Sequence, residues 1–188
     1  MTTLTLGTIQ QLTTTPERPA SLPRILIRNE PLPFTDAEPR RHILAVDPGP
    51  ELSAWVWFED GHPLQWAKEP NPAVLELCGS LQGAPLVIEQ VRSYGMPVGA
   101  EVFETVRWSG RFEQVAGSAH YLPRLRVKLH HCHSPKANDA TIRQAIIDRY
   151  GGRDRAIGLK ATPGPLYGIK ADCWSALALG LAWLEGAV

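Results

Sequence analysis

The pattern of hydrophobic and polar positions changes character at about residue 41. Residues 1–40 are rich in Thr and Pro. Because Pro lacks an amide donor and restricts the residue before it, regular structure is disfavoured there. We therefore expect an extended or partly disordered arm over residues 1–40, in which residues 25–27 could add one short strand. Residues 41–188 alternate apolar runs with polar turns, which indicates one folded domain.

Three apolar runs joined by short polar turns open this domain. They cover residues 42–47, 52–58 and 62–68, and residues 59–61 have the composition of a hairpin turn. Runs of this length, bounded by turn residues, are typical of strands. The pattern therefore predicts a three-stranded meander.

Helical and strand patterns alternate beyond the meander. The predicted elements are helices over residues 72–81, 98–116, from 134 or 138 to 150, and 170–185, strands over 85–89 and 124–129, and a loop over 153–168. A meander followed by alternating helices and strands predicts an α/β domain with a mixed five-stranded sheet and helices packed on it.

Overall charge does not single out a nucleic-acid-binding protein, because 19 Lys and Arg residues balance 19 Asp and Glu residues and the pI is about 7.0. Charge can still be concentrated on one face. Residues 107–126 contain four arginines against one acid, and residues 128–136 contain a second cluster of Lys and His. These clusters fit a local nucleic-acid-binding patch, and they also fit ordinary solvated surface residues.

Cysteine usage and hydropathy indicate a cytoplasmic protein. The three cysteines are odd in number and widely spaced, which argues against a disulfide framework and for a reducing compartment. The start of the chain lacks the basic and apolar regions of a signal peptide. The longest uncharged apolar helix, residues 173–184, has 12 residues and is too short to span a bilayer. We therefore expect no membrane association.

Three acidic residues stand at the ends of predicted elements. Asp47 and Glu89 close two apolar strands, and Asp172 opens the last apolar helix. A carboxylate at the tip of a buried strand is costly to desolvate unless it is paired or holds a cation. Taken singly, each acid also fits an ordinary strand-end or N-cap position. Taken together, they predict a divalent-metal site suited to phosphate chemistry.

Three segments carry these acids in order: residues 43–49, 87–90 and 171–178. In these segments and in the order of its elements, the chain resembles RuvC-type Holliday junction resolvases of the ribonuclease H-like superfamily. Residues 93–99, 101–104 and 136–143 look more like the divergent RuvC-like proteins of phages and prophages. The resemblance covers residues 42–185, and it implies a ribonuclease H-like nuclease domain over residues 41–188.

The resemblance implies a Mg²⁺-dependent, structure-selective DNA endonuclease, similar to crossover junction endodeoxyribonucleases, with Mn²⁺ as a substitute ion. It also implies a homodimer that cuts branched DNA in recombination and repair. Two Mg²⁺ ions about 4 Å apart can activate a water and stabilise the leaving oxygen. Asp47 on the central strand is the natural ligand shared by both ions. Glu89 would hold one ion and Asp172 the other.

One position departs from the family pattern. The family usually has a second acid on the last helix, three residues after the first, and here that position is Ser175. Either Asp139 enters the site as a fourth acid, or three acids and water suffice. Asp139 also fits a helix-dipole or capping contact, because it lies in the first turn of a predicted helix.

Several basic and aromatic residues are candidates for DNA contacts, although surface solvation or internal packing would also explain each of them. They are Lys136 and Arg143 beside Asp139, Lys170 before Asp172, Tyr94 in the loop after Glu89, and Arg107 and Arg111 on the long helix. Trp108 and Phe112, four residues apart on that helix, could form an exposed pair for dimerisation or stacking. Trp55, Trp57 and Trp66 are expected in the core and on the sheet faces.

The run from His130 to His133 contains residue types that bind zinc, but neighbours at a predicted strand end point in opposite directions. Zinc sites usually place their ligands in separated pairs. The pattern favours one of these histidines near the acidic site, as a proton carrier or phosphate contact.

Two other functions fit the same residues. Ser175 and the neutral net charge also fit a catalytically weak or inactive ribonuclease H-like module that binds DNA. A nuclease acting on forks, flaps or RNA–DNA hybrids would need the same acids, because they recognise phosphate geometry and not branch topology. Metal binding separates the first alternative from an active nuclease, and a panel of substrates separates the second.

Overall fold

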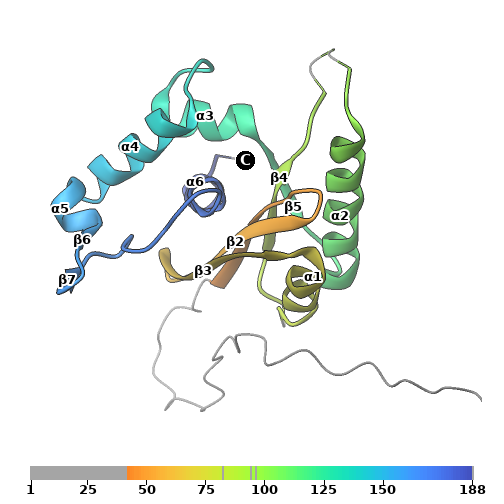
Figure 1. Cartoon of the computed structure of the whole chain (residues 1–188), viewed down its shortest axis with the longest axis horizontal. Helices are drawn as coiled ribbons and strands as arrows, with labels where there is room; N and C mark the ends of the chain where they lie inside the picture. Colours follow the sequence, from red (N-terminus) through yellow and green to blue (C-terminus); the bar gives the residue numbers. More distant parts are fainter. Residues whose placement is uncertain (1–41, 82, 94, 96, 188) are drawn as a thin grey trace, which may run out of the picture. The chain divides into compact units, whose positions relative to one another are not determined.

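The structure is a computed structural model that describes residues 42–187, except residues 82, 94 and 96. The arm predicted over residues 1–40 and the candidate Tyr94 lie outside the described residues. Over the described residues, the predicted α/β architecture is confirmed: a five-stranded mixed sheet is covered by helices on both faces (Figure 1).

The sheet has the strand order β3-β2-β1-β4-β5. Its strands are β1 (His42–Asp47), β2 (Leu52–Glu59), β3 (His62–Pro70), β4 (Leu86–Gln90) and β5 (His120–Pro123). β1, β2 and β3 form the predicted antiparallel meander, whereas β4 runs parallel to β1 and β5 parallel to β4. Val46 lies opposite Ile88, so the residues that follow them, Asp47 and Glu89, reach the same edge of the sheet.

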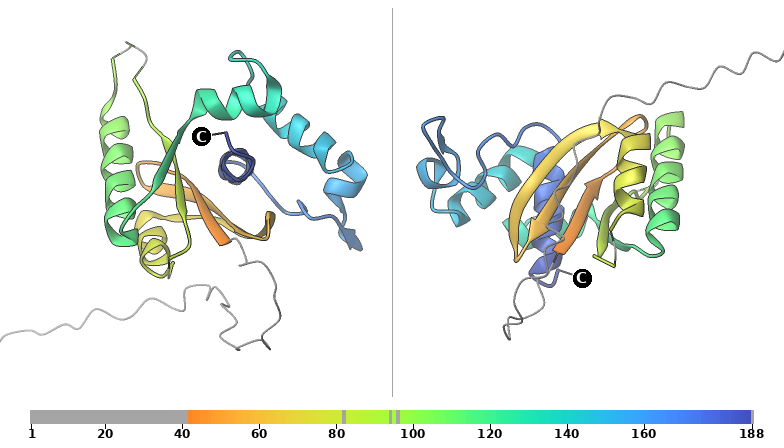
Figure 2. Two further views of the ribbon diagram at one scale, coloured as in Figure 1. Left: turned by 180° about the vertical axis from the view of Figure 1, so that it is seen from behind. Right: turned by 90° about the horizontal axis from the view of Figure 1, so that it is seen from below.

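Helices cover the two faces of the sheet unequally. They are α1 (Asn71–Gly79), α2 (Ala100–Ala116), α3 (Arg124–Cys132), α4 (Asp139–Arg149), the short α5 (Arg153–Ala156) and α6 (Cys173–Leu184). α1 and α2 lie on one face, and α6, with α3 and α4 beside it, lies on the other, as Figures 1 and 2 show. Because both faces are buried, the central strands are nearly continuous apolar runs.

The two hydrophobic cores follow the alternation of side chains along β1. Ile43 and Ala45 face α6, whereas Leu44 and Val46 face α1 and α2. α6 approaches the sheet closely at Gly180, where a Cβ atom would lie 2.2 Å from the ring of Phe58. The close approach fixes α6 against β1 and β2, and it therefore also fixes the position of Asp172 at the start of this helix.

The prediction of a strand over residues 124–129 is wrong, because these residues form the first turns of α3. Leu125, Val127 and Leu129 alternate with polar residues and so suggested a strand. Only Val127 of these three is buried, and the next buried residue is His131, four positions later. That spacing is helical. The fifth strand is the segment just before, His120–Pro123.

The predicted loop over residues 153–168 contains α5 and a small hairpin of β6 (Gly158–Leu159) and β7 (Thr162–Pro163). The prediction that Trp108 and Phe112 form an exposed pair is also wrong, because Phe112 is fully buried. α2 buries Thr105, Ser109 and Phe112 and leaves Phe103 and Val106 exposed. The buried strand residues Trp55 and Trp57 lie in the core as expected.

Candidate active site

Four carboxylates from four elements lie near one another at one edge of the sheet. Asp47 ends β1, Glu89 is the penultimate residue of β4, Asp139 opens α4, and Asp172 immediately precedes α6. The charge of Asp47 is coupled to those of Glu89 and Asp172, and the charge of Glu89 is coupled to that of Asp139. The three acids singled out in the sequence therefore share one neighbourhood, together with Asp139.

Asp47 is the most perturbed of these acids. Burial raises the pKa of its carboxyl to about 7, and the nearby negative charges of Glu89 and Asp172 act in the same direction. Arg124 and a hydrogen bond from the Ser175 side chain lower this pKa in part. A buried carboxylate with two other acids nearby is a candidate for binding a cation.

A hydrogen-bonded cluster holds the loop that follows Asp47. The Gly49 amide donates to Ser53 Oγ over 3.2 Å, Ser53 Oγ donates to Asn71 Oδ1 over 2.6 Å, and Asn71 Nδ2 donates to the Gly49 carbonyl over 2.9 Å. Ser53 and Asn71 are fully buried. A Cβ atom at position 49 would lie 2.4 Å from the Leu52 carbonyl oxygen, so only glycine fits this turn. Sequence reasoning missed Ser53 and Asn71, because neither forms part of a motif.

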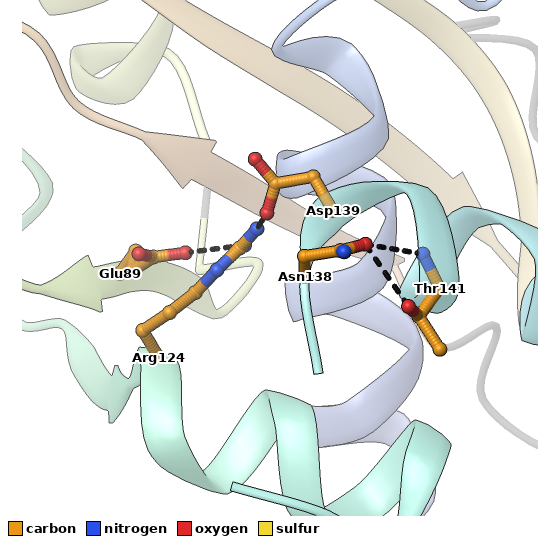
Figure 3. Close-up of polar contacts among 5 residues, drawn as sticks. All are labelled: Glu89, Arg124, Asn138, Asp139 and Thr141. Carbon is orange, nitrogen blue, oxygen red and sulfur yellow. Dashed lines mark hydrogen bonds and ion pairs between the residues drawn. The ribbon is translucent and has the colours of Figure 1, made fainter. Parts of the chain in front are cut away.

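Arg124 connects two of the carboxylates (Figure 3). Its Nη1 atom lies 3.1 Å from Glu89 Oε2, and its Nη2 atom donates to Asp139 Oδ1. Burial raises the pKa of Glu89, and the charge and hydrogen bond of Arg124 lower it. Arg124 was not singled out from the sequence either, because it stood among other arginines in a basic stretch.

Asn138 explains how Asp139 comes to face Arg124. The Asn138 side chain accepts hydrogen bonds from the backbone and the hydroxyl of Thr141, each over 2.9 Å, and so caps α4 (Figure 3). The predicted cap at Asn138 is confirmed. Because Asn138 caps the helix, the largely exposed Asp139 carboxylate is available to bind Arg124.

Asp172 pairs with a lysine that is distant in the sequence. Lys68 Nζ on β3 donates to Asp172 Oδ2 over 2.6 Å, and both side chains are about half exposed. Asp172 occupies the N-cap position of α6, but its side chain makes no capping hydrogen bond. Ala171, just before it, has a positive φ of 44°, which few non-glycine residues adopt. This turn directs the chain into α6 with the Asp172 carboxylate facing Lys68.

The donor chemistry fits a hard divalent cation. All four acids offer carboxylate oxygens, the kind of ligand atom that Mg²⁺ prefers. Burial and the charges of Glu89 and Asp172 raise the pKa of Asp47 by more than Arg124 lowers it. Among the residues that the structure describes, no three His, Cys, Asp or Glu side chains are close enough to hold a metal ion. Arg124 and Lys68 instead occupy oxygens of Glu89, Asp139 and Asp172.

The candidate DNA-binding residues are scattered. Arg143 on α4 stacks over the Trp174 ring of α6, with its guanidinium carbon 4.7 Å from the ring centre. Lys136 and Lys170 are exposed in the segments that precede α4 and α6. Arg107 pairs with Glu104, and Arg111 stacks on Trp108, both on α2, which covers the opposite face of the sheet from α6.

The histidine run ends helix α3 and not a strand, so the geometric premise of the prediction was wrong. His131 is buried, and Arg149 donates to its Nδ1 atom, so Nε2 carries the proton and donates to the Ala178 carbonyl. Burial lowers the pKa of His131. The run lies at the far end of α3 from Arg124. There it helps to line a hollow of about 630 Å³, whose lining residues are Arg126, Leu129, His130, His131, His133, Arg149 and Ala187.

Comparisons with known proteins agree with this fold. No family model and no curated protein matches the sequence. A solved structure of Thermus thermophilus RuvC matches with a TM-score of 0.54 and 13% identity, over 75% of this chain and 92% of that chain. T. thermophilus RuvC in complex with Holliday junction substrate matches with a TM-score of 0.53 and 15% identity, over 76% of this chain and 92% of that chain.

The chain therefore has the ribonuclease H-like α/β fold. Within that class its fold is RuvC-like, as the sequence segments predicted. The placement in a phage and prophage branch stays a prediction. No helix within the described part of the chain is long and apolar enough to cross a membrane.

Proposed function

We propose that the protein is a divalent-metal-dependent, structure-selective endonuclease that hydrolyses phosphodiesters in branched DNA. The observation that carries the proposal is Asp47. It has a pKa of about 7, and it lies with Glu89 and Asp172 at the edge of a RuvC-like sheet. One of the similar structures is a complex with a Holliday junction substrate, which supports branched DNA as the substrate.

Asp47, Glu89 and Asp172 would hold Mg²⁺, or Mn²⁺ in its place, with Asp139 as the candidate fourth acid. When bound, the ion activates a water and stabilises the leaving oxygen. The residues of the chain orient this group. Ser175 hydrogen-bonds to Asp47 in place of the acid that the family pattern has there. Lys68 positions the carboxylate of Asp172.

The nucleic acid would lie across the exposed side of the carboxylates. Lys136, Arg143 and Lys170 flank Asp139 and Asp172 in the sequence and are exposed, so they are the first candidates for phosphate contacts. Arg107 and Arg111 are proposed as more distant contacts, and Tyr94, outside the described residues, keeps its predicted role as a DNA contact. Arg107 and Arg111 are on α2, and they would reach DNA only beyond the immediate site.

A homodimer would supply two sites for symmetric cleavage of two strands. The exposed apolar side chains of α2 support this part of the proposal. Phe103 is 65% exposed and Val106 is 50% exposed, and they are one helical turn apart. Sedimentation of the parent and of Phe103→Asp with Val106→Asp tests it. A dimer that becomes monomeric supports the proposal, and a parent that is monomeric throughout contradicts it.

Cleavage of defined substrates tests the main proposal. Four-way junction, fork, flap, linear duplex and RNA–DNA hybrid are incubated with and without Mg²⁺. We expect the parent to cut the junction or another branched substrate only with the ion, and Asp47→Asn to lose at least 100-fold in rate. Asp148→Asn is the matched control, because Asp148 is an exposed acid on α4 whose side chain bonds only to Gln144 within the described residues. Equal cleavage by Asp47→Asn and the parent would refute the proposal.

A second candidate function is a catalytically inactive module that binds DNA. Two features favour it: Ser175 replaces an acid, and Arg124 and Lys68 occupy the carboxylates. A ligand that binds only the folded state raises its melting temperature. A Mg²⁺ or Mn²⁺ titration that produces no shift at millimolar concentration would favour this function, and a shift that Asp47→Asn abolishes would favour the nuclease.

A further inference from the structure

Glu89 and Asp139 share one guanidinium although they lie on different elements. Arg124 is the first residue of α3, Glu89 lies near the end of β4, and Asp139 is the first residue of α4. The two nitrogens of Arg124 bind one carboxylate each (Figure 3). Both ion pairs therefore depend on a single side chain, which ties the start of two helices to the edge of the sheet.

The position of Arg124 is unfavourable for reasons of local structure alone. A cation at a helix N-terminus faces the positive end of the helix dipole. The first turn of α3 contains no acid that would compensate for it. The compensation comes from Glu89 and Asp139, which are distant in the sequence. The partners of Arg124 therefore lie in the carboxylate group and not within its own helix.

The two ends of this ion-pair bridge differ in exposure. The Glu89 side chain is 18% exposed, whereas that of Asp139 is 81% exposed, and Arg124 itself is 21% exposed. Arg124 thus reaches from the buried carboxylates toward the surface that a nucleic acid would approach. Its planar fork matches the geometry of a phosphate as well as that of a carboxylate.

We propose that Arg124 is a metal-displaced clamp: it holds Glu89 until a divalent cation binds that carboxylate, and the released guanidinium then binds a phosphate of the nucleic acid. This inference rests on the proposed function, because it assumes that Glu89 is a metal ligand. Glu89 Oε2 cannot at once accept fully from Arg124 and serve the ion, so ion binding costs the Arg124–Glu89 contact.

The clamp predicts that Arg124 weakens the binding of the ion alone and strengthens the binding of DNA in the presence of the ion. Without nucleic acid, Arg124 competes with the ion, so its removal tightens ion binding. With nucleic acid, the freed Arg124 adds a phosphate contact, so the ion raises the affinity for DNA. Two ligands that favour the same released state of Arg124 bind cooperatively and reciprocally.

The first experiment measures the affinity for Mn²⁺ in the absence of DNA by calorimetry on the whole chain. We expect Arg124→Gln to bind Mn²⁺ about tenfold more tightly than the parent, as expected for loss of a charged hydrogen bond that the ion must break. Arg124→Lys keeps the charge but cannot bridge two carboxylates, and we expect at least a threefold gain. Arg126→Gln is the matched control, because Arg126 lies on the same helix and its side chain has no hydrogen bond or ion pair to another described residue.

The results separate the clamp from a general charge effect. If Arg124→Gln gains no more affinity than Arg126→Gln, or if Arg124→Lys binds Mn²⁺ as the parent does, the clamp is refuted. Melting curves without metal show that each variant is folded. Should Arg124→Gln fail to fold, the Arg124→Lys variant alone decides, because it retains the positive charge beside Glu89.

The second experiment measures four-way junction binding by fluorescence anisotropy, with and without Ca²⁺, and checks by gel that the DNA stays intact. We expect Ca²⁺ to raise the affinity of the parent and of Arg126→Gln at least fivefold, and Arg124→Gln to lose most of this gain. Full retention of the gain by Arg124→Gln would refute the phosphate contact. A parent that binds no Mn²⁺ at all contradicts the proposed function, whereas a parent that binds and cleaves with no effect of Arg124 contradicts only the clamp.

Discussion

Replacing Asp47 by Asn should stabilise the protein at neutral and higher pH. The pKa of Asp47 is raised from 3.8 to about 7, mainly by burial and then by Glu89. The folded state therefore holds this proton more tightly than the unfolded chain. This contribution to stability is fully present below a pH of about 4, and it is lost as the pH rises through about 7.

The magnitude follows from the shift. A rise of roughly 3 pKa units corresponds to about 4 kcal/mol of disfavoured charge at pH 8. Asn cannot ionise, and its amide retains a partner in Ser175, so we expect Asp47→Asn to raise the free energy of unfolding by about 2–4 kcal/mol at pH 8. A domain of this size would then melt roughly 5–10 °C higher. At pH 4 the two proteins should agree within about 1 kcal/mol.

Urea denaturation followed by tryptophan fluorescence, at pH 4 and pH 8 with EDTA, measures this difference. Asp148→Asn serves as the control, and it should stay within about 0.5 kcal/mol of the parent at both pH values, because Asp148 is exposed. Added Mg²⁺ should stabilise the parent at pH 8 and not Asp47→Asn. If Asp47→Asn is no more stable than the parent at pH 8, the reasoning that Asp47 is a buried, cation-binding carboxylate with a raised pKa is wrong.

Two further substitutions test how the site is supported. Asn71→Ala removes two hydrogen bonds and leaves buried partners unsatisfied, so it should lower the free energy of unfolding in urea by about 2–4 kcal/mol. It should also weaken Mn²⁺ binding, because the loop after Asp47 loses its support. Unchanged stability would refute the structural role of the buried cluster. Gly180→Val forces a side chain into the ring of Phe58, so it should cost about 1–3 kcal/mol or more, and a melting temperature equal to that of the parent would contradict the close packing of α6.

The sheet edge that carries the site was predictable from the sequence. Two continuous apolar runs, each leading into an acid, place both acids at one edge once the strands are parallel neighbours. Asp172 followed from the start of a long apolar helix. What the sequence does not contain is the distance between these ends in space. The packing of α6 against the sheet, close at Gly180, brings Asp172 to them.

The basic residues of the site could not be predicted from their proximity to the acids in the sequence. Lys170 stands two residues before Asp172, yet the lysine that pairs with Asp172 is Lys68, 104 residues away. Arg124 was hidden by one error in the predicted secondary structure. Its segment was taken for a strand, because alternating apolar residues also fit a helix with a single buried stripe. A helix that begins at residue 124 would have drawn attention to an arginine at its first position.

The number of Mn²⁺ ions bound per chain, and their affinity, tests most directly whether the three acids form one metal site. Calorimetry on the parent and on Asp47→Asn, Glu89→Gln and Asp172→Asn makes the comparison, with Asp148→Asn as control. We predict that the parent binds Mn²⁺ at millimolar concentration or below, and that each of the three variants loses at least tenfold in affinity. Binding of equal strength by the parent and all three variants, or no binding by the parent, would contradict the account.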